Sequence, residues 1–549
     1  MQIIVPMSGF GERFKKLGYS LPKPLIEVEG KPMIAHVIDL FSKEDDFIFI
    51  VNEEHLKNKN FNLYNKLKKY CPNGKIYSIP KHKLGPIHAI NMIKSKIKKN
   101  EETIVNYCDF SCYWNYKDFK NFIEKHKPHG AIPAYKNFHP HSLNKTNYAY
   151  LKYKNSNALD IQEKEPFTQN KMNEFASSGT YYFKNANLMF KAFSYVFEKN
   201  LEVNGEYYVS LAYKYLFKLK KTVLIYELQH FMQWGTPEDL EEYKTWSNIF
   251  KNILNIKNNK QFNWNCIIPM AGKGQRFINE GYETPKPLIQ VSGRKMFIQA
   301  INLLPQVKNY SFTLRKDFRK NNLNTIKNKN KLVFFNHLMK DTNGQATSAK
   351  LALDRIYKSN KNNLEPLIIG ACDHGAIFCH EKLNKLITNS DVDIIVWGKR
   401  RHAKSITNPE MFGWIKEKQN KILEVSVKKP FSNPKNDPII IGTFIFKKPS
   451  YYYESYKQII KKRILVNGEY YVDSCINEAI KLGYKCYYFE IDQLISWGTP
   501  DELKTFEYWQ SCFHKWKKHP YDINLDNMIP SNKKSNLISN YMRFNKNSF

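Results

Sequence analysis

The sequence predicts two tandem α/β domains, each with a doubly wound, mixed and mostly parallel sheet between two layers of helices. Three observations predict this fold class. A long segment occurs twice within the 549 residues, short apolar runs end at Gly-rich loops, and strand-like runs alternate with helix-like stretches.

The repeat is long enough to be a whole domain. PMSGFGERFKKLGYSLPKPLIEVEG starts at Pro6, and PMAGKGQRFINEGYETPKPLIQVSG starts 263 residues later at Pro269. The same spacing separates NGEYYV at Asn204 from its copy at Asn467, and it also separates the two WGTP segments. A period of this length suits a complete domain and is too long for a solenoid repeat.

The domain boundaries follow from the two copies. We predict a first domain at 1–247, a linker rich in Asn and Lys at 248–264, a second domain at 265–512 and a basic C-terminal tail at 513–549. The tail has no second copy and little periodicity, so it is either a docking extension or disordered.

Strands and helices alternate within each copy. IIVPM and CIIPM are short apolar runs that stop at a Gly-rich segment, as buried parallel strands do. A helix is predicted over 31–41 and a strand over 47–51, and the predicted helices at 87–97 and 346–356 lead to the strands TIVNYCD and PLIIGACD. Ligands bind at the carboxyl ends of such strands, where Asp109 and Asp373 stand.

Composition narrows the class of partner. The formal charge of +34 comes from Lys residues scattered among Asn, without a zinc-finger, basic-zipper or RNP-like pattern, so we expect anionic small substrates and no nucleic acid. The nine Cys residues form no CxxC pairs, which indicates a reduced, cytoplasmic chain. The predicted strand beginning at Gln2 leaves no room for a signal peptide, and no apolar stretch approaches a membrane span.

The Gly-rich loop has the chemistry of a phosphate cradle. Gly9 and Gly11 let the backbone turn tightly and expose N–H groups to phosphate oxygens. The loop lacks the third Gly of a dinucleotide-binding fingerprint, because Phe14 and Phe277 stand there, and it lacks the GK[ST] of a P-loop. Taken alone, it is equally well read as a plain strand-to-helix turn.

Two cations follow the loop at fixed distances in both copies. They are Arg13 and Lys23 in the first copy and Arg276 and Lys286 in the second, and each Lys lies between two Pro residues. This arrangement resembles the GxGxR, PKPL and VxGKPMI signature of the nucleotidylyltransferases that make activated sugars and related phosphate esters. It is most similar to the branch that ends in GTPEDL, which includes cytidylyltransferases and enzymes of surface-polysaccharide supply.

The resemblance implies a Rossmann-like (GT-A-like) fold and transfer of a nucleotidyl group to a small phosphate ester, with release of pyrophosphate. It implies catalytic roles for Arg13, Lys23, Arg276 and Lys286, and Mg²⁺ binding by Asp109 and Asp373. It implies nucleotide contacts from Met7, Ser8, Gly9, Gly11, Gly85, Met270, Ala271, Gly272, Gly274 and Gly344. It implies acceptor contacts from Glu163, Lys164, Glu206, Lys428 and Glu469.

The copies depart from the family pattern at several positions. Gln233 and Ser496 stand where many members carry a second metal-binding Asp, and Val427 replaces Glu163 in the second copy. Asp473, in contrast, matches the family better than its counterpart Ser210. We therefore expect both copies to be competent, with the first the safer assignment for catalysis.

Two alternative functions stay open. One copy could be a nucleotide-binding regulatory module, or the chain could be a GT-A glycosyltransferase, although the PKPL Lys argues against the latter. We interpret Asp391 and Asp393 as a helix-to-strand turn and not a DxD metal motif. We interpret the His residues at 126, 129, 139 and 141 as surface or loop residues. The base, the acceptor and any homo-oligomeric state are left open.

Overall fold

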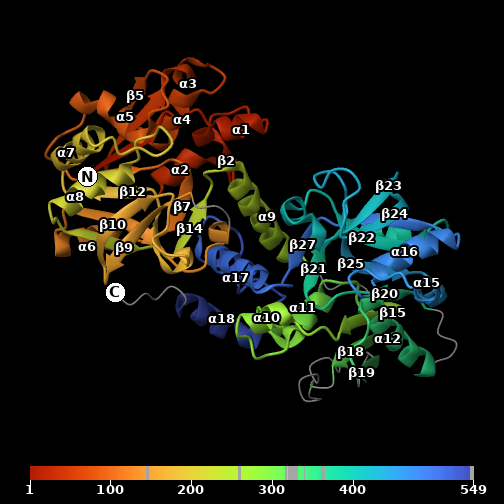
Figure 1. The fold of residues 1–549 in the computed structure, drawn as a ribbon. Coiled ribbons are helices and arrows are strands. Elements are labelled where there is room, and N and C mark those ends of the chain that lie inside the picture. The colour runs from red at the N-terminus through yellow and green to blue at the C-terminus, as the bar shows by residue number, and fades with distance from the viewer. Residues whose placement is uncertain are drawn as a thin grey trace. The chain divides into compact units, whose positions relative to one another are not determined.

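The computed structural model describes residues 1–143, 147–256, 261–315, 318, 332–338, 340–359 and 365–543 (Figure 1). Residues 257–260 of the predicted linker and 544–549 of the predicted tail lie outside the described residues. The chain divides into two compact units. The first comprises Met1–Ser247, Tyr508–Pro520 and Ser539–Phe549, and the second comprises Asn248–Glu507 and Tyr521–Ile538.

The first unit contains a ten-stranded sheet in the order β11-β9-β10-β13-β8-β12-β6-β1-β4-β5. Its strands are β1 (Gln2–Met7), β4 (Asp46–Asn52), β5 (Lys75–Ile79), β6 (Thr103–Asn106), β8 (Gly130–Tyr135), β9 (Ala149–Lys154), β10 (Asn157–Glu163), β11 (Phe175–Ser177), β12 (Thr180–Phe183) and β13 (Val223–Glu227). Two small sheets pair β2 (Glu27–Val28) with β3 (Lys31–Pro32), and β7 (Phe110–Tyr113) with β14 (His230–Gln233).

Alternation along the strands explains the layers of this unit. Ile4, Ile48 and Ile50 belong to one buried core, whereas Ile3 and Val5 belong to another. Because successive strand side chains point to opposite faces, the sheet needs an apolar cover on both sides. The helices are α1 (Glu12–Lys16), α2 (Met33–Ile38), α3 (Glu53–Lys57), α4 (Leu63–Tyr70), α5 (Gly85–Met92), α6 (Tyr116–His126), α7 (Ala186–Glu198), α8 (Tyr213–Lys218) and α9 (Pro237–Ile253). Residues of α5, α7 and α8 join the first core, and residues of α2, α4 and α6 join the second.

The second unit repeats this strand order. Its nine-stranded sheet runs β19-β18-β15-β20-β25-β22-β26-β24-β23, and β25 takes the places of both β11 and β12. The strands are β15 (Phe262–Met270), β18 (Val307–Arg315), β19 (Leu332–Leu338), β20 (Leu367–Ile369), β22 (Ile394–Lys399), β23 (Gly413–Lys418), β24 (Lys421–Val427), β25 (Ile439–Phe446) and β26 (Cys486–Glu490). Smaller pairs join β16 (Gln290–Val291) to β17 (Arg294–Lys295), and β21 (His374–Ile377) to β27 (Gln493–Ser496).

The helices of the second unit also cover both faces of its sheet, with two separate buried cores. They are α10 (Gln275–Asn279), α11 (Met296–Asn302), α12 (Gln345–Ser359), α13 (His380–Thr388), α14 (Ala403–Thr407), α15 (Pro449–Lys461) and α16 (Val472–Lys481). Two further helices, α17 (Pro500–Lys515) and α18 (Ser531–Arg543), each contribute residues to both units.

The predicted fold class is confirmed. In the first unit β1 pairs in parallel with β4 and β6, and in the second unit β15 pairs in parallel with β18 and β20. Antiparallel pairings enter at β12 and β25, which makes both sheets mixed. The predicted helix at 31–41 is shorter than expected, because β3 occupies its first residues and α2 spans only Met33–Ile38.

The predicted turn at Asp391 is confirmed, and His139 and His141 lie in a loop segment as interpreted, but they are not at the surface. Asp391 and Asp393 lie between α13 and β22, and Asp393 accepts a hydrogen bond from the backbone of Lys485. His139 and His141 are buried, and burial lowers the pKa of His139 to about 3. The sequence could not show this burial, because their loop packs on the aromatic ring of Tyr135, which comes from β8.

The C-terminal part of α17 packs within the first unit. Tyr508 donates a hydrogen bond to the carbonyl of Phe231 at 2.7 Å, and His230 lies 3.1 Å from the Ser511 hydroxyl. Residues 521–538 belong to the second unit, where the carbonyl of Met528 accepts a hydrogen bond from Arg294. No helix among the described residues has the length and apolarity that a membrane crossing requires.

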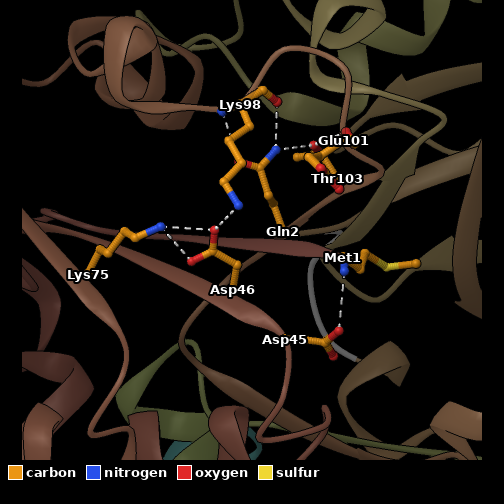
Figure 2. Close-up of polar contacts among 8 residues, drawn as sticks. All are labelled: Met1, Gln2, Asp45, Asp46, Lys75, Lys98, Glu101 and Thr103. Atoms are coloured by element: carbon orange, nitrogen blue, oxygen red, sulfur yellow. Dashed lines mark hydrogen bonds and ion pairs between the residues drawn. The ribbon is translucent and has the colours of Figure 1, made fainter.

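A polar cluster anchors the amino ends of the central strands (Figure 2). The buried amide of Gln2 donates to the carbonyl of Lys98 at 2.8 Å and to the hydroxyl of Thr103 at 3.2 Å, and it accepts from the Lys98 amide at 2.9 Å. Beside it, Asp46 binds Lys75 at 2.8 Å and Lys98 at 3.3 Å. This cluster lies at the opposite end of β1 from the Gly-rich loop.

We predict that Gln2→Leu weakens the first unit, because it leaves buried partners without hydrogen bonds at a cost of about 1–3 kcal/mol. Amide hydrogen exchange of β1 and β6 checks this, with β15 and β20 as the internal reference. The exposed substitution Lys43→Gln is the control and should leave exchange unchanged. Equal protection of β1 in Gln2→Leu and the parent would contradict the prediction.

Candidate active sites

A lysine–aspartate ion pair lies at the carboxyl ends of the central strands in each unit. In the first unit, Lys23 Nζ lies 2.5 Å from Asp109 Oδ2 and 2.7 Å from the carbonyl of Gly235. In the second unit, Lys286 Nζ lies 2.5 Å from Asp373 Oδ2. Each Lys side chain is 19% exposed and each Asp side chain 25% exposed, so the two pairs are equally accessible.

The Gly-rich loop lies directly against each lysine. Gly11 has a φ of 62°, and a Cβ placed on it would lie 3.5 Å from Lys23 Cβ. Gly274 has a φ of 69°, and a Cβ there would lie 2.9 Å from Lys286 Cβ, which is too close for any other residue. The left-handed backbone and the close approach both require glycine at this point.

The second pair is electrostatically coupled. Burial alone would raise the pKa of Asp373, but the charge of Lys286 and the neighbouring His374 lower it well below its ordinary value. Burial would lower the pKa of Lys286, yet Asp373 raises it above its ordinary value. Both groups are therefore charged at neutral pH, as an ion pair requires.

His374 is a residue that sequence reasoning missed. Its Nδ1 lies 3.4 Å from Asp373 Oδ1, and the first unit has Phe110 at the corresponding position. The sequence signal was present, because His374 directly follows the predicted metal-binding residue. The two units therefore differ in the immediate surroundings of the aspartate.

The closing WGTP segment binds the backbone of the aspartate. Trp234 donates its backbone N–H to the carbonyl of Asp109 at 3.0 Å, and Trp497 donates to the carbonyl of Asp373 at 2.8 Å. A Cβ on Gly235 or Gly498 would lie 3.2 Å from the carboxylate of the respective aspartate. The small residue thus lets the closing segment approach the ion pair.

A further acid of interest follows each WGTP segment: Asp239 in the first unit and Glu502 in the second. From the sequence alone, both were only part of a closing motif. Asp239 accepts a hydrogen bond from the Thr236 hydroxyl at 2.8 Å, and burial raises the pKa of Asp239 to about 6. Glu502 accepts from the Ser496 hydroxyl at 2.8 Å. Burial would raise the pKa of Glu502, but Lys404 lowers it below its ordinary value. Both acids lie in the first turn of a helix, where they exchange hydrogen bonds with the capping residues Thr236 and Thr499, so part of their role is structural.

The segments at Gly85 and Gly344 form the same backbone hydrogen bonds with the NGEYYV segment of their own unit. The backbone of Tyr207 accepts from Ile87 at 3.2 Å and donates to Leu84 at 3.0 Å, while Tyr470 bonds to Ala346 and Asn343 at 3.0 and 2.8 Å. Both glycines have positive φ, and a Cβ on either would lie under 3.0 Å from the tyrosine backbone. These predicted base-side and acceptor-side segments are therefore physically joined.

The predicted acceptor lysines lie beside a tyrosine that the sequence analysis did not single out. Lys164 Nζ lies 2.6 Å from the hydroxyl of Tyr208, which in turn donates to Glu206. In the second unit Lys428 Nζ lies 5.7 Å from the ring centre of Tyr471. Lys164 and Lys428 also share a left-handed backbone, with φ of 61° and 66°.

Glu163 is the last residue of β10 and directly precedes Lys164. Its carboxylate accepts a hydrogen bond from the Ser210 hydroxyl at 2.5 Å. Burial raises the pKa of Glu163 to about 7, although the Ser210 bond and the Lys164 charge oppose the shift. Glu163 therefore exchanges a proton near neutral pH.

Most of the other predicted site residues lie on or beside the Gly-rich loops, and Glu469 lies in the NGEYYV segment. Met7 and Met270 end buried strands, while Gly9 and Gly272 are exposed. Ser8 is buried, Ala271 is half-buried and Glu469 is exposed. Arg13 and Arg276 are exposed on α1 and α10, and neither guanidinium has an ion-pair partner in the described part of the chain.

The donor set at each aspartate fits a cation that is shared with a substrate. Among the described residues, no three His, Cys, Asp or Glu side chains come together in a way that could hold a metal ion. Each site does offer one partly exposed carboxylate, a ligand type that Mg²⁺ commonly combines with phosphate oxygens and water. Asp109 and Asp373 can therefore contribute to a metal site, and substrate would have to complete it.

The match to a known family lies in the first unit. The family model described as nucleotidyl transferase matches residues 3–222. Mannose-1-phosphate guanyltransferase from Aspergillus oryzae is 28% identical over 138 residues, covering 24% of this chain and 36% of that protein. The Kluyveromyces lactis enzyme of the same name is 28% identical over 142 residues, covering 25% of this chain and 38% of that protein.

The chain thus spans just over a third of the length of these curated relatives. A nucleoside-diphosphate-sugar pyrophosphorylase from Vibrio cholerae superposes with a TM-score of 0.37 at 21% identity, covering 44% of this chain and 98% of that one. Residues 3–222, within the first unit, are therefore similar to the nucleotidyl transferase family.

Proposed function

We propose that the chain is a tandem nucleotidylyltransferase. Each unit transfers a nucleoside monophosphate from a nucleoside triphosphate to a sugar 1-phosphate or a similar small phosphate monoester, and pyrophosphate leaves. The observation that carries this proposal is the Lys–Asp pair, which has the same 2.5 Å distance and the same exposure in both units. The matching strand order of the two sheets supports assigning the same reaction to both.

The chemistry asks mainly for positioning and charge neutralisation. A phosphate oxygen of the acceptor attacks the α-phosphorus, the bond to the bridging oxygen of the pyrophosphate breaks, and that oxygen keeps the electron pair. Lys23 and Lys286 are compact cations fixed at the strand ends, and they are suited to the charge that develops there. Arg13 and Arg276 are exposed forks beside the Gly-rich loop and can hold the pyrophosphate.

Mg²⁺ is the metal we propose for the carboxylates of Asp109 and Asp373. When bound, it supplies charge neutralisation to the phosphate oxygens. The lysines already hold one carboxylate oxygen of each aspartate, and this contact orients the group before substrate arrives. On the acceptor side, Lys164 and Lys428 hold the phosphate, while Glu163, Glu206 and Glu469 accept from hydroxyl groups.

The names of the relatives indicate which substrates to try first. GTP and mannose 1-phosphate are the first pair to test, followed by the other triphosphates and small phosphate esters. The products would be activated precursors for a surface polysaccharide, such as capsule or lipopolysaccharide, made in the cytoplasm.

A second candidate function makes the second unit a nucleotide-binding regulator. It is favoured by the differences around its site, where His374 stands beside Asp373 and Val427 replaces Glu163. The variants below separate this possibility from two active units.

We predict that Lys23→Ala and Lys286→Ala each lower pyrophosphate release at their own unit by about 10²- to 10³-fold, because each removes a fixed charge at the reacting phosphates. Coupled detection of pyrophosphate across a panel of triphosphates and acceptors is the measurement. The exposed variants Lys16→Ala and Lys308→Ala should behave as the parent. Full activity in the double Lys23→Ala, Lys286→Ala variant would refute the assignment, and release of nucleoside diphosphate in place of pyrophosphate would indicate glycosyl transfer.

We predict that Asp109→Asn, made with Lys286→Ala so that only the first unit reports, raises the Mg²⁺ concentration for half-maximal rate by about 10- to 100-fold. The neutral amide keeps the shape of the side chain but attracts the cation less strongly. A magnesium titration of the initial rate measures the change, with the exposed Asp118→Asn as the control. An unchanged magnesium midpoint would remove Asp109 from the metal site.

A further inference from the structure

Each unit carries one carboxylate at corresponding places on the predicted acceptor side, half-buried in the first unit and buried in the second, but on different elements. In the first unit it is Glu163, the last residue of β10, which pairs with Ala149 on β9. In the second unit the strand position is Val427, which pairs with Gly413 on β23. The carboxylate there is Asp473, in the first turn of α16.

The positions correspond in structure as well as in sequence. Lys164 donates its backbone N–H to the carbonyl of Tyr148 at 2.8 Å, and Lys428 donates to Phe412 at 2.9 Å, so Glu163 and Val427 occupy the same place before that contact. Ser210 and Asp473 each follow the same YYV segment. The exchange is reciprocal. The first unit has a carboxylate on the strand and a hydroxyl on the helical segment, whereas the second unit has an apolar residue on the strand and a carboxylate on the helix.

A third change makes room for the exchange. A Cβ on Gly413 would overlap Asp473 Oδ2, whereas the first unit tolerates Ala149 opposite Glu163. The carboxylate of Asp473 thus lies over the Val427–Gly413 strand pair, next to the position that corresponds to Glu163. These three differences together keep a carboxylate beside this strand pair, but it comes from the strand in the first unit and from the helix in the second.

The two carboxylates differ in the hydrogen-bond donors that surround them. Ser210 donates to Glu163, whereas Val427 has no donor to offer, and within the described residues the Asp473 carboxylate accepts a hydrogen bond only from its own backbone N–H. Asp473 is only 9% exposed, and burial raises its pKa to about 6. A buried carboxylate with so few donors lowers stability, so a ligand hydroxyl would gain more from it than from a group that a neighbouring hydroxyl already satisfies.

We propose that Asp473 is the acceptor-hydroxyl-binding and specificity-determining residue of the second unit, in place of Glu163. This inference rests on the proposed function. Because the carboxylate comes from the helix and is one methylene shorter than that of Glu163, the second unit selects a phosphate ester whose hydroxyl lies in a different position from that of the acceptor of the first unit. The two units therefore prefer different acceptors.

The test uses the full chain with Lys23→Ala, so that only the second unit turns over. Mannose 1-phosphate, glucose 1-phosphate and glycerol phosphate are the acceptors. Asp473→Ser should raise the KM of the preferred acceptor at least about tenfold, the loss of one charged hydrogen bond, with nucleotide KM and kcat little changed. Asp473→Asn, which keeps the shape, should lie between Asp473→Ser and the parent.

The compensating variant makes the test specific. Val427→Glu combined with Asp473→Ser, in the Lys23→Ala chain, should recover acceptor binding and shift the preference toward the acceptor that the first unit favours. A Lys286→Ala chain, in which only the first unit turns over, gives that reference preference. The converse change, Glu163→Val with Ser210→Asp and Ala149→Gly, should shift the first unit toward the preference of the second. Unchanged acceptor KM in Asp473→Ser, or no recovery in the compensated variant, would overturn the proposal.

Thermal unfolding separates a binding role from a packing role. Removing a buried carboxylate whose only hydrogen-bond donor is its own backbone should raise the melting temperature of Asp473→Asn at pH 8, where the group is charged, and less at pH 4.5, where it is neutral. A lower melting temperature with equal loss of acceptor and nucleotide binding would show a structural residue and overturn the proposal.

Failure of the proposed function would look different. If the parent chain releases no pyrophosphate with any pair, calorimetric titration of the same three esters replaces turnover. Weaker ester binding in Asp473→Ser than in the parent would still support the inference. Equal binding, or no binding of any ester to the parent, would overturn it.

Discussion

The ion pair between the PKP lysine and the strand-end aspartate is the interaction on which each site depends. A charge removed from water is tolerated only beside an opposite charge and further hydrogen bonds. Lys23 meets this condition with Asp109 and the carbonyl of Gly235, and Lys286 meets it with Asp373. The pair therefore joins three chain segments that are distant in sequence: the Gly-rich loop region, the strand that ends at the aspartate and the closing WGTP segment.

Around this shared centre, the two units diverge where a substrate would be distinguished. His374 stands where the first unit has Phe110, and the carboxylate of the acceptor wall changes element between Glu163 and Asp473. Gly11 and Gly274 both have a positive φ, and so do Gly85 and Gly344. The backbone of these segments is thus alike in the two units, and the differences lie in the side chains around it.

Much of the fold could be predicted from the sequence. Apolar strands that end at Gly-rich loops and alternate with helices indicated two α/β sheets, and the repeated motifs indicated that the two would be alike. The placement of Asp109 and Asp373 beside the Gly-rich loops followed from a general rule, since parallel strands present their carboxyl ends at one edge. Tyr208 and Glu502 escaped notice because their partners Lys164 and Lys404 lie far away along the chain. His139 and His141 were interpreted as surface or loop residues, and their loop is buried against Tyr135.

The sequence by itself determined the fold class, the family and the residues of the phosphate loop, because these depend on local patterns of apolarity, glycine and charge. Only the tertiary structure decided which carboxylate lies over the Val427–Gly413 strand pair. Val427 in the sequence indicates a lost contact, yet Gly413 opens the space that Asp473 fills from a helix. Such an exchange involves three segments that no periodicity connects, and only their packing brings them to one place.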